Sequence, residues 1–214
     1  MTETRWYRPS VTAVRYLLGA QYLVSGTAWW IKMLPFPSII DAAHFPQKHA
    51  VAAAMIQTGW MYHMAKIIEV LTGLALLADV FVPLMLVVSM SVAVTTFLLD
   101  AWIGQTVIDW IGGRAPFVVL RAKVLDMIYF GGAVLAMQGF LMVAYLDHYK
   151  PMLALKGRLD PTSPSKPAPV SRGLMAVYAI AALFLGVTST FWMIGMINQW
   201  AIPWSSLSIL APPH

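Results

Sequence analysis

The chain of 214 residues contains no cysteine. This absence excludes disulfides, a CxxC redox relay, a cysteine nucleophile and any zinc or iron–sulfur site held by thiolates. Charged residues are also scarce, at 11% of the chain, whereas average soluble proteins contain roughly 25%. Because the chain has no cysteine, any redox activity would depend on a bound cofactor or on a partner protein. The sequence predicts neither catalytic residues nor a metal site.

Hydrophobic residues are correspondingly abundant. Hydrophobic residues make up 59% of the chain and the mean hydropathy is +0.71, which predicts an all-α, polytopic membrane protein in contact with membrane lipids. In a soluble protein the net charge of +5 would suggest a nucleic-acid partner. Here Lys and Arg flank apolar runs, where they set orientation and meet anionic headgroups, so no nucleic-acid partner is expected.

Five apolar runs are long enough to cross a bilayer, which takes about 20 residues per helix. The expected spans are residues 11–31, 59–78, 81–99, 124–145 and 173–197. They divide the chain into a four-helix membrane bundle (1–150), a Pro-rich basic cytoplasmic linker (151–172) and one additional C-terminal transmembrane helix with its tail (173–214).

The distribution of Lys and Arg predicts the orientation of these spans. With the N-terminus in the cytoplasm, eight basic residues fall on that side and five on the other, as expected from the excess of Lys and Arg in cytoplasmic loops. The N-terminus is therefore placed in the cytoplasm and the C-terminus in the periplasm of a bacterial inner membrane. Most tryptophans then fall on the outer side, which fits an interfacial aromatic belt or a surface that docks a partner.

Two connecting segments also carry structural signals. The Ala-rich stretch HAVAAAMIQTGW (49–60) predicts that the second membrane helix begins before it enters the bilayer. In the segment 100–117, Trp102, Trp110 and Ile111 recur at helical intervals, and we expect this segment to lie along the membrane interface.

Lys66 and Glu69 lie inside the second expected span, with Glu69 close to the bilayer midplane. A charge at that depth costs about 2.5–3.5 kcal/mol on insertion scales, so it should face protein or water and have a partner. Three residues apart on a helix, the two side chains share one face and can neutralise each other. The antiparallel first span places Gln21 and Ser25 at matching depths. These four residues are predicted to form a polar cluster, with Gln138 of the fourth span as a further candidate.

Two interpretations of this cluster stay open. In the structural one, the Lys66–Glu69 pair fixes helix packing without doing chemistry. In the functional one, Gln21, Ser25, Lys66 and Glu69 bind a cofactor, such as the headgroup of a quinone. Among the histidines only His63 approaches a span, and an interfacial histidine is favoured there over an axial ligand of haem or chlorophyll.

Three stretches resemble the DoxX-like family of bacterial membrane proteins, which includes the small subunit of thiosulfate:quinone oxidoreductase. They are RYLLGAQYLVSGTAWWIKMLPFP, AKIIEVLTGLALLADVFVPLMLVV and the apolar fourth span, and together they cover residues 15–145. The most specific part is K-x-x-E followed by a glycine, here Lys66, Glu69 and Gly73. The resemblance implies a four-helix membrane bundle linked with redox or quinone-associated systems. The Pro-rich linker and the fifth span depart from that pattern.

Two functions follow as hypotheses. The leading one is a non-catalytic integral subunit of a larger bioenergetic complex, photosynthetic or respiratory, with other membrane subunits as partners and a quinone or a partner-borne pigment nearby. The alternative is a quinone-reducing oxidoreductase subunit, similar to that of thiosulfate:quinone oxidoreductase. In it Lys66 and Glu69 would position the headgroup and shuttle protons, since a low-dielectric site shifts the pKa values of such groups.

Overall fold

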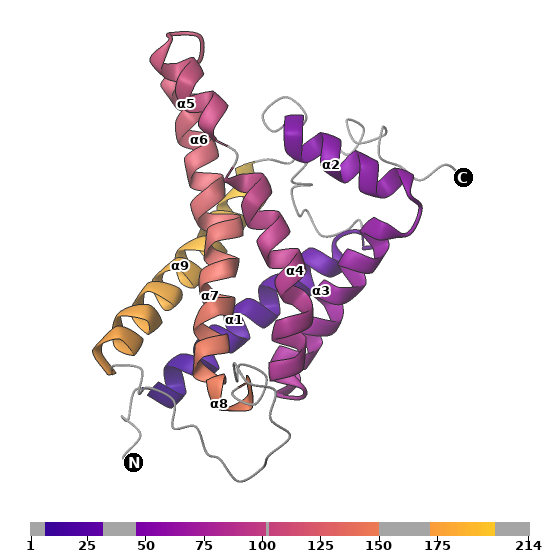
Figure 1. Cartoon of the computed structure of the whole chain (residues 1–214), viewed down its shortest axis with the longest axis vertical. Coiled ribbons are helices and arrows are strands. Elements are labelled where there is room, and N and C mark those ends of the chain that lie inside the picture. The colour runs from indigo at the N-terminus through magenta and orange to yellow at the C-terminus, as the bar shows by residue number, and fades with distance from the viewer. Residues whose placement is uncertain (1–6, 32–45, 102, 150–171, 200–214) are drawn as a thin grey trace, which may run out of the picture.

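The computed structural model describes residues 7–31, 46–101, 103–149 and 172–199, with side chains for all of these except 46–49, 172 and 192–199. Throughout this described part every regular element is helical, which confirms the all-α prediction (Figure 1). The helices are α1 (Tyr7–Thr27), α2 (Pro46–Gln57), α3 (Met61–Ala78), α4 (Val82–Asp100), α5 (Gly104–Ile111), α6 (Phe117–Met127), the π-helical turn η1 (Ile128–Gly132), α7 (Ala133–Ala144), α8 (Leu146–Tyr149) and α9 (Arg172–Gln199).

Four helical stretches are long and apolar enough to cross a membrane, which supports the prediction of a membrane protein. They are Met61–Ala78, Val82–Ile111, Phe117–Ala144 and Gly173–Phe191. The first expected span is helical as well, but α1 is not among the four because polar residues such as Arg15 and Gln21 lower its hydropathy. Both of these side chains are buried, since α1 packs against α3, α7 and α9.

The helix bundle has two ends, which we call proximal and distal. The proximal end contains the start of α1, the turn between α3 and α4, and α8 (Figure 1). In that turn Asp79 and Phe81 have positive φ angles of 59° and 54°. This left-handed backbone is unusual for a bulky residue such as Phe81, and it closes the hairpin within three residues. Arg15 forms an ion pair with Asp79 and ties α1 to the turn.

At the distal end, α2 and α3 form two separate helices. The Ala-rich segment is helical as expected, but Thr58–Trp60 interrupt it, with Gly59 at a φ of 77°. A positive φ is readily adopted by glycine and ends the helix. The prediction of one long second helix is therefore wrong, and α2 crosses the distal end at an angle to α3 (Figure 1).

In the segment 100–117, Gly104–Ile111 forms helix α5, and Trp102 lies outside the described residues. Helix α5 runs alongside α6, and the two project beyond the other helices (Figure 1). The Lys123 ammonium on α6 donates a hydrogen bond to Thr106 Oγ1 on α5 at 2.9 Å. We call this pair of helices the distal hairpin (residues 104–127).

Helices α1 and α3 cross in close contact at three glycines, Gly19, Gly26 and Gly73. A Cβ atom at Gly73 would lie 2.7 Å from Leu23 N and 2.9 Å from Gly19 O, and one at Gly26 would lie 3.0 Å from Lys66 O. Small residues allow membrane helices to approach until their backbones touch. This contact brings the polar side chains of α1 and α3 within hydrogen-bonding range.

Candidate functional site

An ion pair lies halfway along α3, as expected from the sequence. Lys66 Nζ is 2.9 Å from Glu69 Oε2 and 3.1 Å from Oε1. The same ammonium donates to Ser25 Oγ at 3.2 Å and to Ser25 O at 3.3 Å, so it links α3 to α1. It also lies 5.6 Å above the centre of the Tyr62 ring. Ser25, Lys66 and Glu69 therefore form one site, which we call the α1–α3 polar site.

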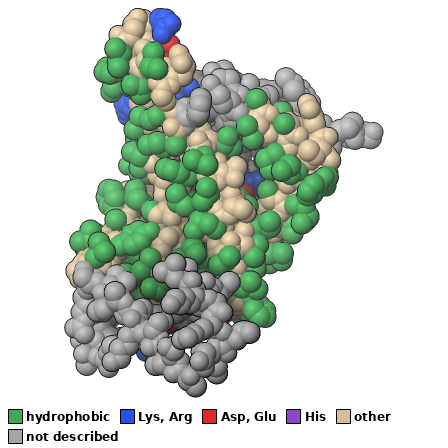
Figure 2. Space-filling model, viewed as in Figure 1, with side chains coloured by type: hydrophobic (Ala, Val, Ile, Leu, Met, Phe, Trp, Pro, Cys, Tyr) green, Lys and Arg blue, Asp and Glu red, His purple; other side chains and the backbone are tan. Residues whose placement is uncertain are grey.

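This site is largely buried but keeps some exposed surface. The side chains of Lys66 and Glu69 keep 13% and 9% of their exposure. Figure 2 shows a recess between α3 and α4, with one basic and one acidic side chain at its base and apolar side chains around it. Glu69 accepts both of its hydrogen bonds among the described residues from the Lys66 ammonium, and a carboxylate has further lone pairs for another donor.

Gln21 was predicted to join this cluster, but it turns toward α9. Its Nε2 atom lies 3.3 Å from both Ser189 Oγ and Thr190 Oγ1 and 3.5 Å from Gly186 O. The structure thus brings three of the four predicted residues together and places the fourth at another helix interface.

Gln138 forms the centre of a third group of polar contacts. It donates to Leu86 O at 2.7 Å and to Ser89 Oγ at 3.1 Å, and it accepts a hydrogen bond from the Tyr22 hydroxyl. These bonds connect α7 to α4 and α1. Polar residues at mid-bundle depth therefore join neighbouring helices instead of facing lipid, as membrane packing requires.

Two buried polar atoms in this region have no hydrogen-bond partner among the described residues, namely Thr72 Oγ1 and Gln21 Oε1. Thr72 lies one helical turn below Glu69 and is fully buried. An unsatisfied buried polar atom costs free energy, and such atoms commonly bind an internal water or a ligand. The α1–α3 polar site thus has an open hydrogen-bonding position beside it.

The distal end of the α1–α3 interface is aromatic. Trp29 Nε1 donates to His63 Nδ1 at 3.2 Å, and the Trp30 ring stacks on His63 with 6.3 Å between ring centres. Because Nδ1 accepts this bond, the imidazole proton resides on Nε2. His63 therefore presents an N–H donor instead of the lone pair that would ligate a metal.

The π-helical turn η1 supplies two further polar links that the sequence did not indicate. The Ser189 hydroxyl of α9 donates to Tyr129 O, and Gly131 N donates to Asp100 Oδ2 at 3.0 Å. A π-turn leaves backbone groups outside the regular α-helical bonding pattern. Side chains from two neighbouring helices bond with these groups.

Comparison with protein-family models gives no match for the chain, and no curated protein or solved structure matches it either. The part of the chain that the structure describes also contains no group of three or more His, Asp or Glu side chains able to hold a metal ion. The DoxX-like resemblance thus rests on the three stretches of sequence within residues 15–145 alone.

Proposed function

We propose that this protein is a non-catalytic integral membrane subunit of a larger bioenergetic complex, photosynthetic or respiratory, in a bacterial inner membrane. Its body is a DoxX-like four-helix membrane bundle in which α1 is the first span, and α9 is the additional fifth span. The N-terminus lies in the cytoplasm, and the distal hairpin and the C-terminus lie on the periplasmic side. The observation that carries the proposal is the distal hairpin, which exposes apolar side chains beyond the length that a bilayer requires.

The length of the hairpin helices decides where these side chains lie. The continuous helix Phe117–Ala144 has 28 residues, which corresponds to about 42 Å at 1.5 Å per residue, whereas the hydrocarbon core is about 30 Å thick. Arg121, Lys123 and Asp126 all lie in its first ten residues, so the excess length falls at the distal end. Acyl chains do not reach the tip of the distal hairpin in this arrangement.

The chemistry of the tip indicates the kind of partner. Ile111, Phe117 and Val118 are strongly exposed, and Arg114 is 66% exposed beside them. Exposed aromatic and apolar residues together with arginine are typical of the core of protein interfaces. We expect a second membrane subunit whose docking surface is apolar and edged with carboxylates.

A photo-crosslinking experiment tests this proposal. Val118 on the distal hairpin and Val177 on α9 are matched positions, with 66% and 65% of their surface exposed. A photoreactive amino acid at each position, expressed in the native bacterium, is expected to give a discrete adduct with one other membrane subunit from position 118 and only lipid adducts from position 177. Lipid adducts or adducts between identical chains at position 118 would overturn the proposal.

A second candidate is a quinone-reducing subunit, and the recess between α3 and α4 favours it. A quinone enters from the lipid phase, and its carbonyl oxygens accept hydrogen bonds from groups such as the Lys66 ammonium. Glu69 beside it would then exchange protons with the reduced headgroup, while a partner subunit supplies the electrons. The open hydrogen-bonding position at Thr72 would suit the same headgroup.

Binding of decylubiquinone to the purified protein tests this second candidate. The double variant Lys66→Met with Glu69→Gln is expected to lose binding. The control Arg114→Met with Asp109→Asn removes an ion pair of the distal hairpin and should keep it. Equal binding by both double variants would exclude a quinone at the α1–α3 polar site.

A further inference from the structure

The α1–α3 polar site lies close to the middle of the bilayer. Glu69 is the ninth of the 18 residues of α3, and a helix of this length covers most of a hydrocarbon core that is about 30 Å thick. The recess at the site opens between α3 and α4 and has apolar side chains around it (Figure 2). Phospholipid headgroups lie about 15 Å away, at the membrane interface. A ligand of this recess therefore enters from the hydrocarbon phase.

The charges of the site balance each other. Lys66 Nζ lies 2.9 Å from Glu69 Oε2, so the pair presents no net charge to a ligand. An ion near the centre of a bilayer is costly unless an opposite charge compensates it. Neither an anion nor a cation would find that compensation in this pair, and the ligand is therefore uncharged.

The hydrogen-bond donors of Lys66 are already in use. An ammonium group has three N–H donors, and three acceptor groups lie around this one. They are the Glu69 carboxylate at 2.9 Å, Ser25 Oγ at 3.2 Å and Ser25 O at 3.3 Å. A ligand that only accepts hydrogen bonds, such as an ether or a quinone, would have to displace Ser25 in order to bond with Lys66.

The acceptors of the site have capacity to spare. A carboxylate offers about four lone-pair positions, and Glu69 receives its hydrogen bonds among the described residues from Lys66 alone. The Ser25 hydroxyl accepts from the same ammonium and has a proton of its own to donate. Because both groups contact one nitrogen atom, a single ligand oxygen can lie within reach of both. A ligand hydroxyl can thus donate to Glu69 and accept from Ser25.

We propose that this recess binds the hydroxyl group of an uncharged, lipid-soluble molecule, either an isoprenoid alcohol or a quinol. The hydroxyl donates to the Glu69 carboxylate, and a hydrogen bond to a charged group is about twice as strong as one between neutral groups. The apolar body of the ligand lies among the apolar side chains of the recess. This inference shares its location with the second candidate function, but it requires neither electron transfer nor a partner subunit. A quinone, whose oxygens only accept, is the weaker ligand.

Matched ligands test the requirement for a hydroxyl group. Farnesol and decylubiquinol carry O–H groups, whereas farnesyl methyl ether and decylubiquinone have similar apolar bodies and no donor. Each is titrated into the full chain in detergent micelles and followed by calorimetry. Dithionite keeps the quinol reduced and has no disulfide to attack in a chain without cysteine.

We expect at least one hydroxyl ligand to bind about tenfold more tightly than its counterpart. The pair that shows this preference identifies the source, an alcohol or a quinol. No preference in either pair, or no binding at all, would overturn the proposal. Tighter binding of decylubiquinone than of decylubiquinol would also overturn it, while supporting the second candidate function.

Matched variants test whether Glu69 is the acceptor. In Glu69→Gln the amide presents N–H donors as well as an oxygen, so the preference for the hydroxyl ligand should fall below about threefold. Asp109→Asn makes the same change of acid to amide on the distal hairpin, where Asp109 pairs with Arg114, and should keep the full preference. The preference is a ratio of affinities within one preparation, so it does not depend on how much of a variant folds. A preference that survives Glu69→Gln would refute the proposal.

Discussion

The two main interfaces of α1 are built in different ways. Against α3, the backbones touch at Gly19, Gly26 and Gly73, and the polar contact is between formal charges. Against α9, side chains fill the space, with Met137 of α7 and Leu17 of α1 both near Gly186. The polar contacts there are neutral, from Gln21 to Ser189 and Thr190.

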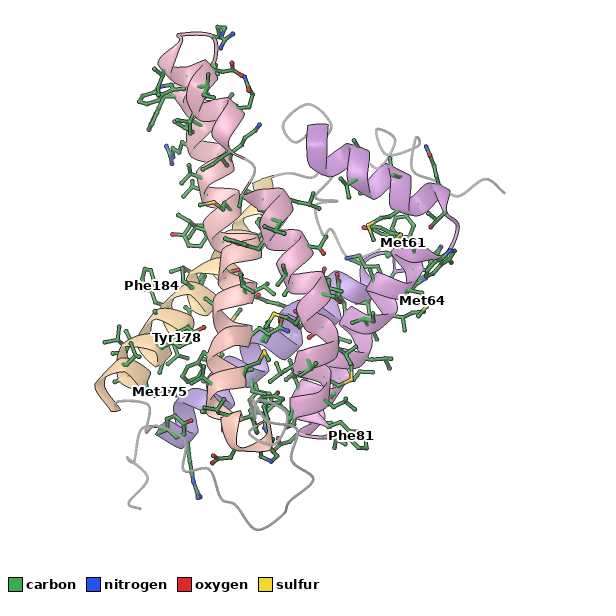
Figure 3. All side chains as sticks on the ribbon, in the orientation of Figure 1. Met61, Met64, Phe81, Met175, Tyr178 and Phe184 are labelled. Carbon is green, nitrogen blue, oxygen red and sulfur yellow. The ribbon has the colours of Figure 1, made fainter. Side chains whose placement is uncertain are left out.

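The difference shows what a charge inside a helix bundle requires. The ammonium of Lys66 has three acceptor groups within 3.3 Å because the glycine crossing brings Ser25 to it. A neutral amide such as Gln21 tolerates longer hydrogen bonds, and its Oε1 atom has no partner within the part of the chain that the structure describes. The face of α9 that points away from the bundle is apolar and exposed. Phe184 lies on this face, whereas Met175 and Tyr178 pack against the bundle (Figure 3).

The largest expected effect comes from breaking the buried ion pair. Lys66→Met should lower the free energy of unfolding by about 3–5 kcal/mol, because it leaves Glu69 uncompensated inside the bundle. Arg114→Met breaks an exposed pair with Asp109 and should cost less than about 1 kcal/mol. Unfolding in mixed micelles with increasing SDS, followed by circular dichroism, measures both. Equal costs for the two variants would mean that the α1–α3 polar site is as solvated as the surface.

The second-largest effect is expected from adding a methyl group at a glycine, which should cost more in the α1–α3 interface than in the α1–α9 interface. Gly73→Ala places a methyl group against the backbone of α1, which cannot move aside, and should cost about 3 kcal/mol. Gly186→Ala meets the end of the Met137 side chain, which can change rotamer, so about 1 kcal/mol is expected. The same SDS titration compares them. A larger cost for Gly186→Ala would reverse the ranking of the two interfaces.

The hydrogen bonds of Gln138 and Gln21 are expected to contribute unequally to the free energy of unfolding. Gln138→Leu removes three buried hydrogen bonds, among them the one that the Tyr22 hydroxyl donates, so about 2 kcal/mol should be lost. Gln21→Leu removes only long bonds and one unsatisfied atom, and its cost should stay below about 1 kcal/mol. If thermal unfolding in detergent shows Gln21→Leu to be the more damaging, an additional partner must satisfy its Oε1 atom.

The smallest effect concerns the proximal end, outside the apolar spans. Tyr149 donates to Pro83 O at 2.8 Å, and burial, followed by the neighbouring Tyr145, raises the pKa of Tyr149 to about 12. The unfolded chain ionises near a pKa of about 10, so the stabilisation is present below that pH and is lost as the pH rises toward 12. Tyr149→Phe should therefore unfold more easily than the original protein at pH 8, and this difference should shrink at pH 11. A constant difference would show that Tyr149 does not titrate as the structure implies.

Much of the bundle could be predicted from the sequence, because the depth of a residue in the membrane follows from counting residues along its helix. Counting residues from the turn at Asp79 placed Ser25 opposite Lys66, and the two do bond. Counting could not say in which direction each side chain of α1 points around the helix axis. Gln21 lies one turn from Ser25, but α1 is surrounded by helices and crosses α3 at an angle, so Gln21 meets α9 instead.

Other features were missed although the sequence carried some signal for them. Gly19 and Gly26 are seven residues apart on α1, a spacing that marks a close helix contact, and the pattern of Lys66, Glu69 and Gly73 places its glycine where α1 crosses. Gly59 signalled the break between α2 and α3. The π-turn had no comparable signal, because one extra residue in a turn leaves the apolar pattern of 124–145 almost unchanged.

The π-turn η1 has a consequence for the direction in which the distal hairpin points. An inserted residue advances the rest of a helix by about 100° of rotation and about 1.5 Å of length. Deleting one residue within Ile128–Gly132 would restore regular α-helix and swing the hairpin around the axis of α7, while the helices below stay in place. The direction in which Phe117 and Val118 face is therefore set by one extra residue in the middle of the same helix, about ten residues away from them along the chain.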